Sequence, residues 1–312
     1  MRMQFNNFAV ENLADGQVTP EEIQVLRQLG WADGKMDPDE AEALFAIHDS
    51  LVDQNREWCD FFVEALSNFI VNTVKPQGHV DQEMADELIA RIDRDGRLNS
   101  LAELELLVRV LEIATSAPAM LRSYALQQIE LSVEQGEGPT RHGDLGGDGI
   151  NSTEVDLLRR LIFPARRAGA ATVCNAEVGM LFRIKDATLY EANARQWQAL
   201  FVQGVASYLL GFANSEALST ERAHELEAFM HNQGAEIGGF LSRIVTRDGA
   251  DAFGSLLSNA EVEVPDLEEG ADWLRHQLEA DEELDELEKA LIAFIDAETG
   301  ATFVPRPKAL AV

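Results

Sequence analysis

The sequence predicts an all-α protein, a duplicated helical bundle with two similar halves of about six helices each. The first observation is composition: Ala, Leu and Glu dominate, and the 312 residues include only nine prolines and three tyrosines. These residue types favour helix over strand. The second observation is a helix–turn–helix step that occurs twice in the first half, and the third is the return of the first half's blocks in the second half.

The first helix–turn–helix step lies at residues 26–47. Gly34 follows a helical pattern and suits the left-handed conformation just past a helix end. Asp37 is expected to cap the next helix, with Pro38 at its first position and Glu40 at its third. The step returns at residues 95–110, where Ser100 and Glu103 have the spacing of a capping box.

The second half repeats blocks of the first in the same order, with insertions between them. Each helix–turn–helix step contains an Asp-Gly turn, the first at residues 33–34 and the second at 95–96. A weaker match relates residues 284–294 to the helix after the second Asp-Gly turn. The matched blocks are 18–27 with 150–159, 44–49 with 181–186, 58–63 with 197–202, and 94–96 with 247–249. The expected domains are a first helical repeat at 1–135, a Gly-rich linker at 136–149, a second, degenerate repeat with acidic C-terminal helices at 150–298, and a tail at 299–312.

The formal net charge of −30 limits the classes of partner that the chain can bind. Nucleic acid and anionic membrane surfaces would be repelled, so cations, basic proteins or solubility alone remain as reasons for the charge. The two cysteines imply no disulfide framework. No stretch resembles a signal peptide or a membrane span, so a cytoplasmic setting is expected.

The acids around the two Asp-Gly turns are candidate oxygen ligands for a divalent cation such as Ca²⁺ or Mg²⁺. Neither turn has the ligand order of an EF-hand, and the same residue types also cap helices, so both interpretations stay open. The candidate metal ligands are Asp33, Asp37, Asp39, Glu40, Asp93, Asp95 and Glu103.

Other chemistry finds little support in the sequence. Glu221 and His224 form one E-x-x-H pair, with His231 on the same helical face, which would suit zinc only if acids from other helices converged there. No P-loop, G-x-S-x-G, H-E-x-x-H or C-x-x-C motif occurs, and no nucleophile–base constellation is visible. We therefore do not expect an enzyme; a metal-dependent hydrolase or oxidase is the alternative.

At residues 32–45 and 94–107 the chain resembles the TerB-like helical family, named for tellurite-resistance proteins. The resemblance lies in an Ala-Asp-Gly turn, an apolar residue, a polar pair and a Glu before an apolar helix, and it covers mainly the first half. It implies a helical bundle with an acidic cluster, suspected of binding divalent metal and linked to stress or membrane-associated complexes. Carried over, that cluster would be Asp33, Asp37, Glu40, Asp95 and Glu103.

The expected function is that of a non-enzymatic acidic interaction or scaffold protein, whose first half would bind a divalent cation or act in stress. Its partner would be a protein, with a basic one favoured by charge. The alternative is a nucleic-acid mimic that inhibits a basic partner. The sequence leaves the oligomeric state and the physiological ligand open.

Overall fold

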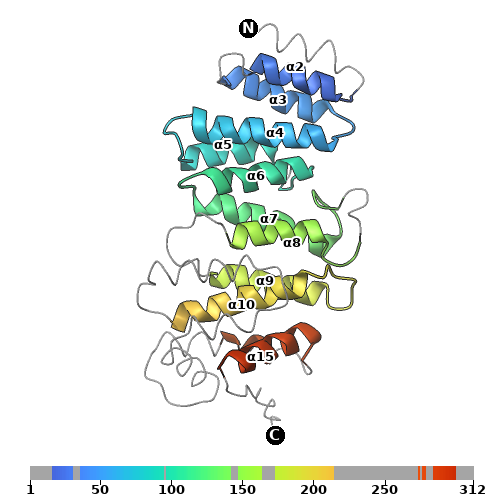
Figure 1. Ribbon diagram of the computed structural model, residues 1–312, viewed down its shortest axis with the longest axis vertical. Coiled ribbons are helices and arrows are strands. Elements are labelled where there is room, and N and C mark those ends of the chain that lie inside the picture. The colour runs from blue at the N-terminus through green and yellow to red at the C-terminus, as the bar shows by residue number, and fades with distance from the viewer. Residues whose placement is uncertain are drawn as a thin grey trace. The chain divides into compact units, whose positions relative to one another are not determined.

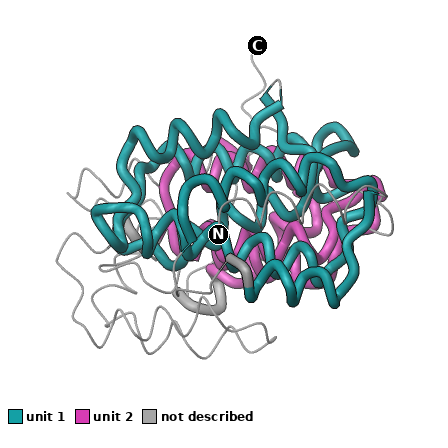
Figure 2. Tube along the Cα trace, turned by 90° about the horizontal axis from the view of Figure 1, so that it is seen from above, with its two compact units in different colours: residues 1–146 teal, residues 147–312 magenta. Residues whose placement is uncertain are grey.

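The secondary structure is helical throughout the part of the chain that the structure describes. The computed structural model describes residues 16–30, 36–94, 96–141, 147–163, 173–213, 273–274, 276–278 and 284–299. Helix accounts for 70% of these residues, without strands, so the all-α prediction is confirmed. None of the described helices is long and apolar enough to cross a membrane. The chain divides into two compact units, residues 1–146 and 147–312 (Figure 2).

The described helices of unit 1 (residues 1–146) follow one another along the unit (Figure 1). Helix α4 packs against α2, α3 and α6, and α6 packs in turn against α7. Helix α4 is therefore the centre of this unit. The helices are α2 (Pro20–Gly30), α3 (Pro38–Ser50), α4 (Arg56–Asn68), the π-helix η1 (Phe69–Thr73), α5 (Gln82–Ile92), α6 (Leu101–Ile113) and α7 (Ala119–Gln135).

Helix α4 buries a stripe of apolar side chains whose helical spacing the sequence already shows. Asn55 caps it by accepting the backbone N–H of Trp58 at 2.9 Å. The sequence predicts one helix over residues 56–74, but the α-helix ends at Asn68 and a single π-helical turn follows. In that turn the Val74 N–H donates to the Phe69 carbonyl, which widens the backbone ring by one residue. The buried stripe comprises Trp58, Phe61, Phe62, Ala65 and Leu66.

Unit 2 (residues 147–312) has α10 at its centre. Residues 200–209 of α10 are all buried, as expected for a helix that is apolar on every side. Gly204 on α10 lets α9 approach, because a Cβ atom there would collide with the Leu181 side chain. The described helices are α8 (Ser152–Ile162), α9 (Asn175–Ala187), α10 (Trp197–Ala213) and α15 (Glu286–Thr299), and α10 contacts the other three.

In each unit a short segment before the first described helix docks on the loop after the second described helix. In unit 1, Val18 is buried, and its carbonyl accepts the side-chain amide of Asn55 at 2.8 Å. In unit 2, Ile150 is buried, and its carbonyl accepts the backbone N–H of Ala194 at 2.8 Å. The predicted linker at 136–149 contains the division between the units, and Gly136 ends α7 in the left-handed conformation with φ 67°.

Candidate functional site

The buried carboxylates of the described residues share one structural role. Each is the third residue of its helix and accepts backbone N–H groups at the helix start, as the third residue of a capping box does. In α3, for example, Glu40 accepts the Asp37 N–H at 2.8 Å, and Asp37 accepts the Glu40 N–H at 3.0 Å. The buried carboxylates are Glu40, Glu103, Glu154, Glu177 and Glu288.

The candidate metal ligands of the first Asp-Gly turn therefore divide into two groups. Asp37 and Glu40 cap α3 and bind each other's backbone, which gives the capping interpretation direct support. Asp39 lies exposed in the first turn of α3, where a negative charge is favourable beside the helix dipole. Asp33 lies outside the described residues.

The second Asp-Gly turn is held by Asp93 and by its contact with α7. Asp93 Oδ1 accepts the Gly96 N–H at 2.6 Å, and Asp93 Oδ2 accepts the Tyr124 hydroxyl at 2.7 Å. Burial and the Asp93 carboxylate raise the pKa of the Tyr124 phenol well above its ordinary value. Both Asp93 oxygens thus have protein partners, while Asp95 lies outside the described residues.

Glu103 is turned into the protein from the start of α6. Its Oε2 accepts the N–H groups of Asn99 at 3.0 Å and Ser100 at 3.1 Å, and its side chain is only 5% exposed. Burial raises the pKa of this carboxyl, although the two backbone bonds act in the opposite direction. Among the described residues no group of three or more His, Cys, Asp or Glu side chains could hold a metal ion. Cation binding at the Asp-Gly turns stays a prediction, and the pair His224 and His231 lies outside the described residues.

A buried polar group of unit 1, His48 of α3, contacts α4 and the start of α6 and was not singled out from the sequence. The Trp58 indole Nε1 of α4 lies 3.2 Å from His48 Nδ1, and Ser100 Oγ lies 3.0 Å from His48 Nε2. The Phe62 ring stacks on the imidazole with centroids 4.1 Å apart. Glu103 Oε1 lies 4.0 Å from Nε2. His48 therefore joins α3 and α4 to the start of α6.

These contacts fix the tautomer of His48. An indole N–H only donates, so Nδ1 must accept the bond from Trp58. A neutral imidazole carries one proton, which consequently sits on Nε2 and is donated to Ser100 Oγ. Burial lowers the pKa of His48 from 6.5 to about 4, with Arg91 and Arg94 adding to the decrease and Asp49 opposing it. The ring is accordingly neutral at physiological pH.

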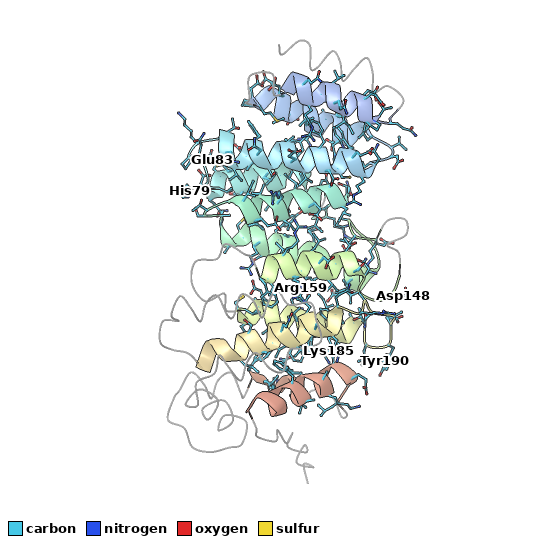
Figure 3. All side chains as sticks on the ribbon, in the orientation of Figure 1. His79, Glu83, Asp148, Arg159, Lys185 and Tyr190 are labelled. Atoms are coloured by element: carbon cyan, nitrogen blue, oxygen red, sulfur yellow. The ribbon has the colours of Figure 1, made fainter. Side chains whose placement is uncertain are left out.

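In unit 2 Lys185 of α9, labelled in Figure 3, is a buried cation that joins helices. Its ammonium donates to Glu288 of α15 at 2.9 Å and contacts Asp285 and Asp186 at 2.5 and 2.7 Å. Burial disfavours the charge, but the three carboxylates more than offset this and raise the pKa of Lys185. The matched blocks 44–49 and 181–186 align His48 with Lys185, and this alignment was the signal that could have drawn attention to both.

The two sites differ in what they offer the neighbouring tryptophan. Trp197 of α10 is 1% exposed, and its indole N–H has no hydrogen-bond partner among the described residues. A lysine ammonium has three donors and no acceptor, so Lys185 cannot accept this N–H as His48 accepts that of Trp58. The His48 and Lys185 side chains are 2% and 1% exposed, so both join helices in the interior of their units.

Comparison with protein-family models, curated proteins and solved structures gives no significant match.

Proposed function

We propose that this chain is a non-enzymatic helical interaction protein whose acidic helix faces bind a basic protein partner. One observation carries the proposal: every buried carboxylate of the described residues sits at the start of a helix and accepts backbone N–H groups there. The inward acids thereby serve the fold. The outward acids, in a chain with 55 acidic and 25 basic residues, are left to act at the surface.

Helix α5 offers the clearest outward acidic face. Glu83, Asp86 and Glu87 are exposed and share one side of the helix by spacing; Figure 3 labels Glu83 at the edge of the unit. Glu83 and Glu87 have no ion-pair partner among the described residues. The inward side of α5 carries Ala85, Leu88 and Ile92. A basic surface docked on α5 would therefore neutralise charge without disturbing the core.

The two units support the proposal as a repeated scaffold. Capping pairs occur in the same order in both, which is what a duplication would produce. We propose on this basis, and on the matched sequence blocks, that unit 2 is a diverged copy of unit 1 and that the fold is TerB-like. The capping pairs are Thr19 and Glu22, Asp37 and Glu40, and Ser100 and Glu103 in unit 1, and Asn151 and Glu154, Cys174 and Glu177, and Asp285 and Glu288 in unit 2.

The test begins with a partner isolated by affinity capture, purified, and titrated calorimetrically into the full chain at two salt concentrations. The expected partner is a basic protein, and its affinity should fall as salt rises. The charge reversal Glu83→Lys and Glu87→Lys should weaken binding at least tenfold. A matched reversal on α4, Glu57→Lys and Asp60→Lys, controls for net charge and should have a smaller effect. A salt-independent affinity that both variants retain would overturn the proposal.

The same titration separates this function from nucleic-acid mimicry. If the partner is itself a nucleic-acid-binding protein, competing DNA or RNA should displace the chain completely when the chain occupies the nucleic-acid site. Simultaneous binding of both would exclude mimicry and leave the scaffold role. Saturable Ca²⁺ or Mg²⁺ binding to chelator-treated protein, lost in Asp37→Asn, would instead assign the acids to a cation.

A further inference from the structure

The imidazole of His48 has a single lone pair, and the protein occupies it with a donor. Nε2 carries the proton given to Ser100 Oγ, so only Nδ1 can take up another proton. The Trp58 indole N–H points at Nδ1 from 3.2 Å. Protonation would place two N–H donors face to face at that distance. Protonation of His48 is therefore strongly disfavoured while Trp58 keeps its position.

The charges around His48 do not relieve this conflict. On α6, Glu103 Oε1 lies 4.0 Å from Nε2, the nitrogen that already bears a proton. On α3 itself, Asp49 is bound by Arg91 of α5 and by Arg94 after it, at 3.0 Å in both cases. These two arginines oppose a further positive charge on His48.

The remaining neighbours of the ring do not titrate in this range. Helix α4 presents Trp58 and Phe62, and the α3–α4 loop presents Gln54, whose amide nitrogen lies 3.3 Å from Nε2. No described anion faces Nδ1. The proton-accepting side of the ring thus meets only an uncharged donor.

The described residues of unit 2 show no such arrangement. Lys185 is already a cation and gives its donors to Asp186, Asp285 and Glu288. Mild acid leaves that cation unchanged, because a lysine ammonium holds its proton throughout the range in which histidine titrates.

We propose that the contact between His48 and Trp58 is a proton-sensitive latch: mild acid weakens the packing of α4 on α3 and favours the opening of unit 1 over that of unit 2. The proposal is independent of the binding partner. The direction follows from linkage: in the opened unit His48 titrates near its ordinary pKa of 6.5, whereas in the closed unit burial holds its pKa at about 4. Between these values the opened form binds the extra proton, so opening becomes more favourable as pH falls.

The first test measures hydrogen exchange by mass spectrometry on the full chain at pH 7.5 and pH 5, corrected for intrinsic exchange rates. A single proton taken up by His48 should increase the opening equilibrium of α3 and α4 about 30-fold at pH 5. The corrected exchange of α9 and α10 should change far less. An equal rise in both units would overturn the proposal, because it would show a general effect of acid.

Two variants separate the latch from simple burial. His48→Gln keeps an acceptor for Trp58 and a donor for Ser100 without a titrating ring, so the acid step in α3 and α4 should disappear. Trp58→Phe removes the opposing N–H, so the pKa of His48, followed by NMR, should rise towards 6.5. A structural role alone would leave that pKa unmoved. His79→Gln, at an exposed histidine of the same unit, is the matched control and should keep the wild-type acid step.

Further outcomes decide the proposal even if a variant fails to fold. In the wild type, a His48 pKa at or above 6.5 in the folded protein overturns it, and a value well below 6.5 supports it. The Trp58 indole proton should leave its hydrogen-bonded position in step with His48 protonation. An acid step that appears only with added chelator, or vanishes with it, would assign the transition to a bound cation and overturn the latch.

Discussion

Lys185 of α9 donates to Glu288 of α15 at 2.9 Å across 103 residues of sequence, and both side chains are 1% exposed. This bond ties α15, the last described helix of unit 2, to α9. It also joins two residues whose types are rarely buried unless they are paired. Removal of one partner from such a pair is costly mainly because it leaves the charge of the other partner buried without compensation.

Removal of the Lys185 ammonium should therefore destabilise unit 2 strongly. Lys185→Met keeps most of the apolar stem but leaves Asp285 and Glu288 buried without their cation. We expect the free energy of unfolding to fall by about 3–5 kcal/mol, measured by denaturant titration. The control is Lys289→Met, which breaks an exposed pair with Glu286 and should change stability by at most about 1 kcal/mol. Equal losses in the two variants would contradict a buried ion pair.

Glu103 should show the opposite pH dependence from His48. Its pKa is raised in the folded state, so the folded protein holds this proton more tightly than the unfolded chain does. Stability contributed by Glu103 is therefore lost as pH rises above its ordinary value of 4.5 through the raised value. Glu103→Gln keeps an acceptor for the capping bonds without the charge. The difference in stability between this variant and the wild type should favour the variant more at pH 8 than at pH 4. Thermal unfolding of both proteins at both pH values measures this difference.

Tyr124 should ionise at higher pH than an exposed tyrosine. Burial and the bond to Asp93 both disfavour the phenolate, and Tyr190, 93% exposed, supplies an internal comparison. A spectrophotometric titration follows the phenolate signal as pH rises. The part of this signal that Tyr124→Phe removes should appear in the most alkaline part of the wild-type curve. Asp93→Asn should move the Tyr124 step to lower pH, because the neighbouring negative charge is gone. An unchanged step would show that burial alone sets the pKa.

The close approach of α9 and α10 depends on the absence of a side chain at Gly204. Gly204→Ala should lower the free energy of unfolding by about 1–3 kcal/mol through overpacking against Leu181. Gly179→Ala, within α9, is the matched change: its Cβ would meet only Arg183 Nη1 at 3.4 Å. That substitution should be neutral or stabilising by about 0.5–1 kcal/mol, since alanine favours helix. A stabilising Gly204→Ala would contradict the packing argument.

The helix starts were predictable from sequence because their signals are local. Asp37 with Glu40 and Ser100 with Glu103 are three residues apart, and the structure places both pairs in capping boxes as expected. The apolar stripe of α4 was equally visible, whereas its π-helical end was not, since that end depends on how Val74 leaves the helix.

The interior polar contacts were beyond a single-sequence prediction. His48 meets Ser100 across 52 residues, and Lys185 meets Asp285 across 100, and no local spacing encodes either contact. The acids of the Asp-Gly turns were ambiguous in the sequence for a different reason. Acidic residues serve in caps and in cation sites alike, so only the bonds of Asp37, Glu40 and Glu103 support capping here, whereas those of Asp93 hold the turn.

The docked segments at Val18 and Ile150 bear on how this chain can be divided. Each unit carries, before its first described helix, an apolar residue that is buried against a loop of the same unit. A cut between Arg141 and Gly147 would therefore leave both of these contacts intact, whereas a cut after Ile150 would remove the one in unit 2. The modularity of this protein thus depends on the docked residue before the first described helix of each unit as much as on the connection between the units.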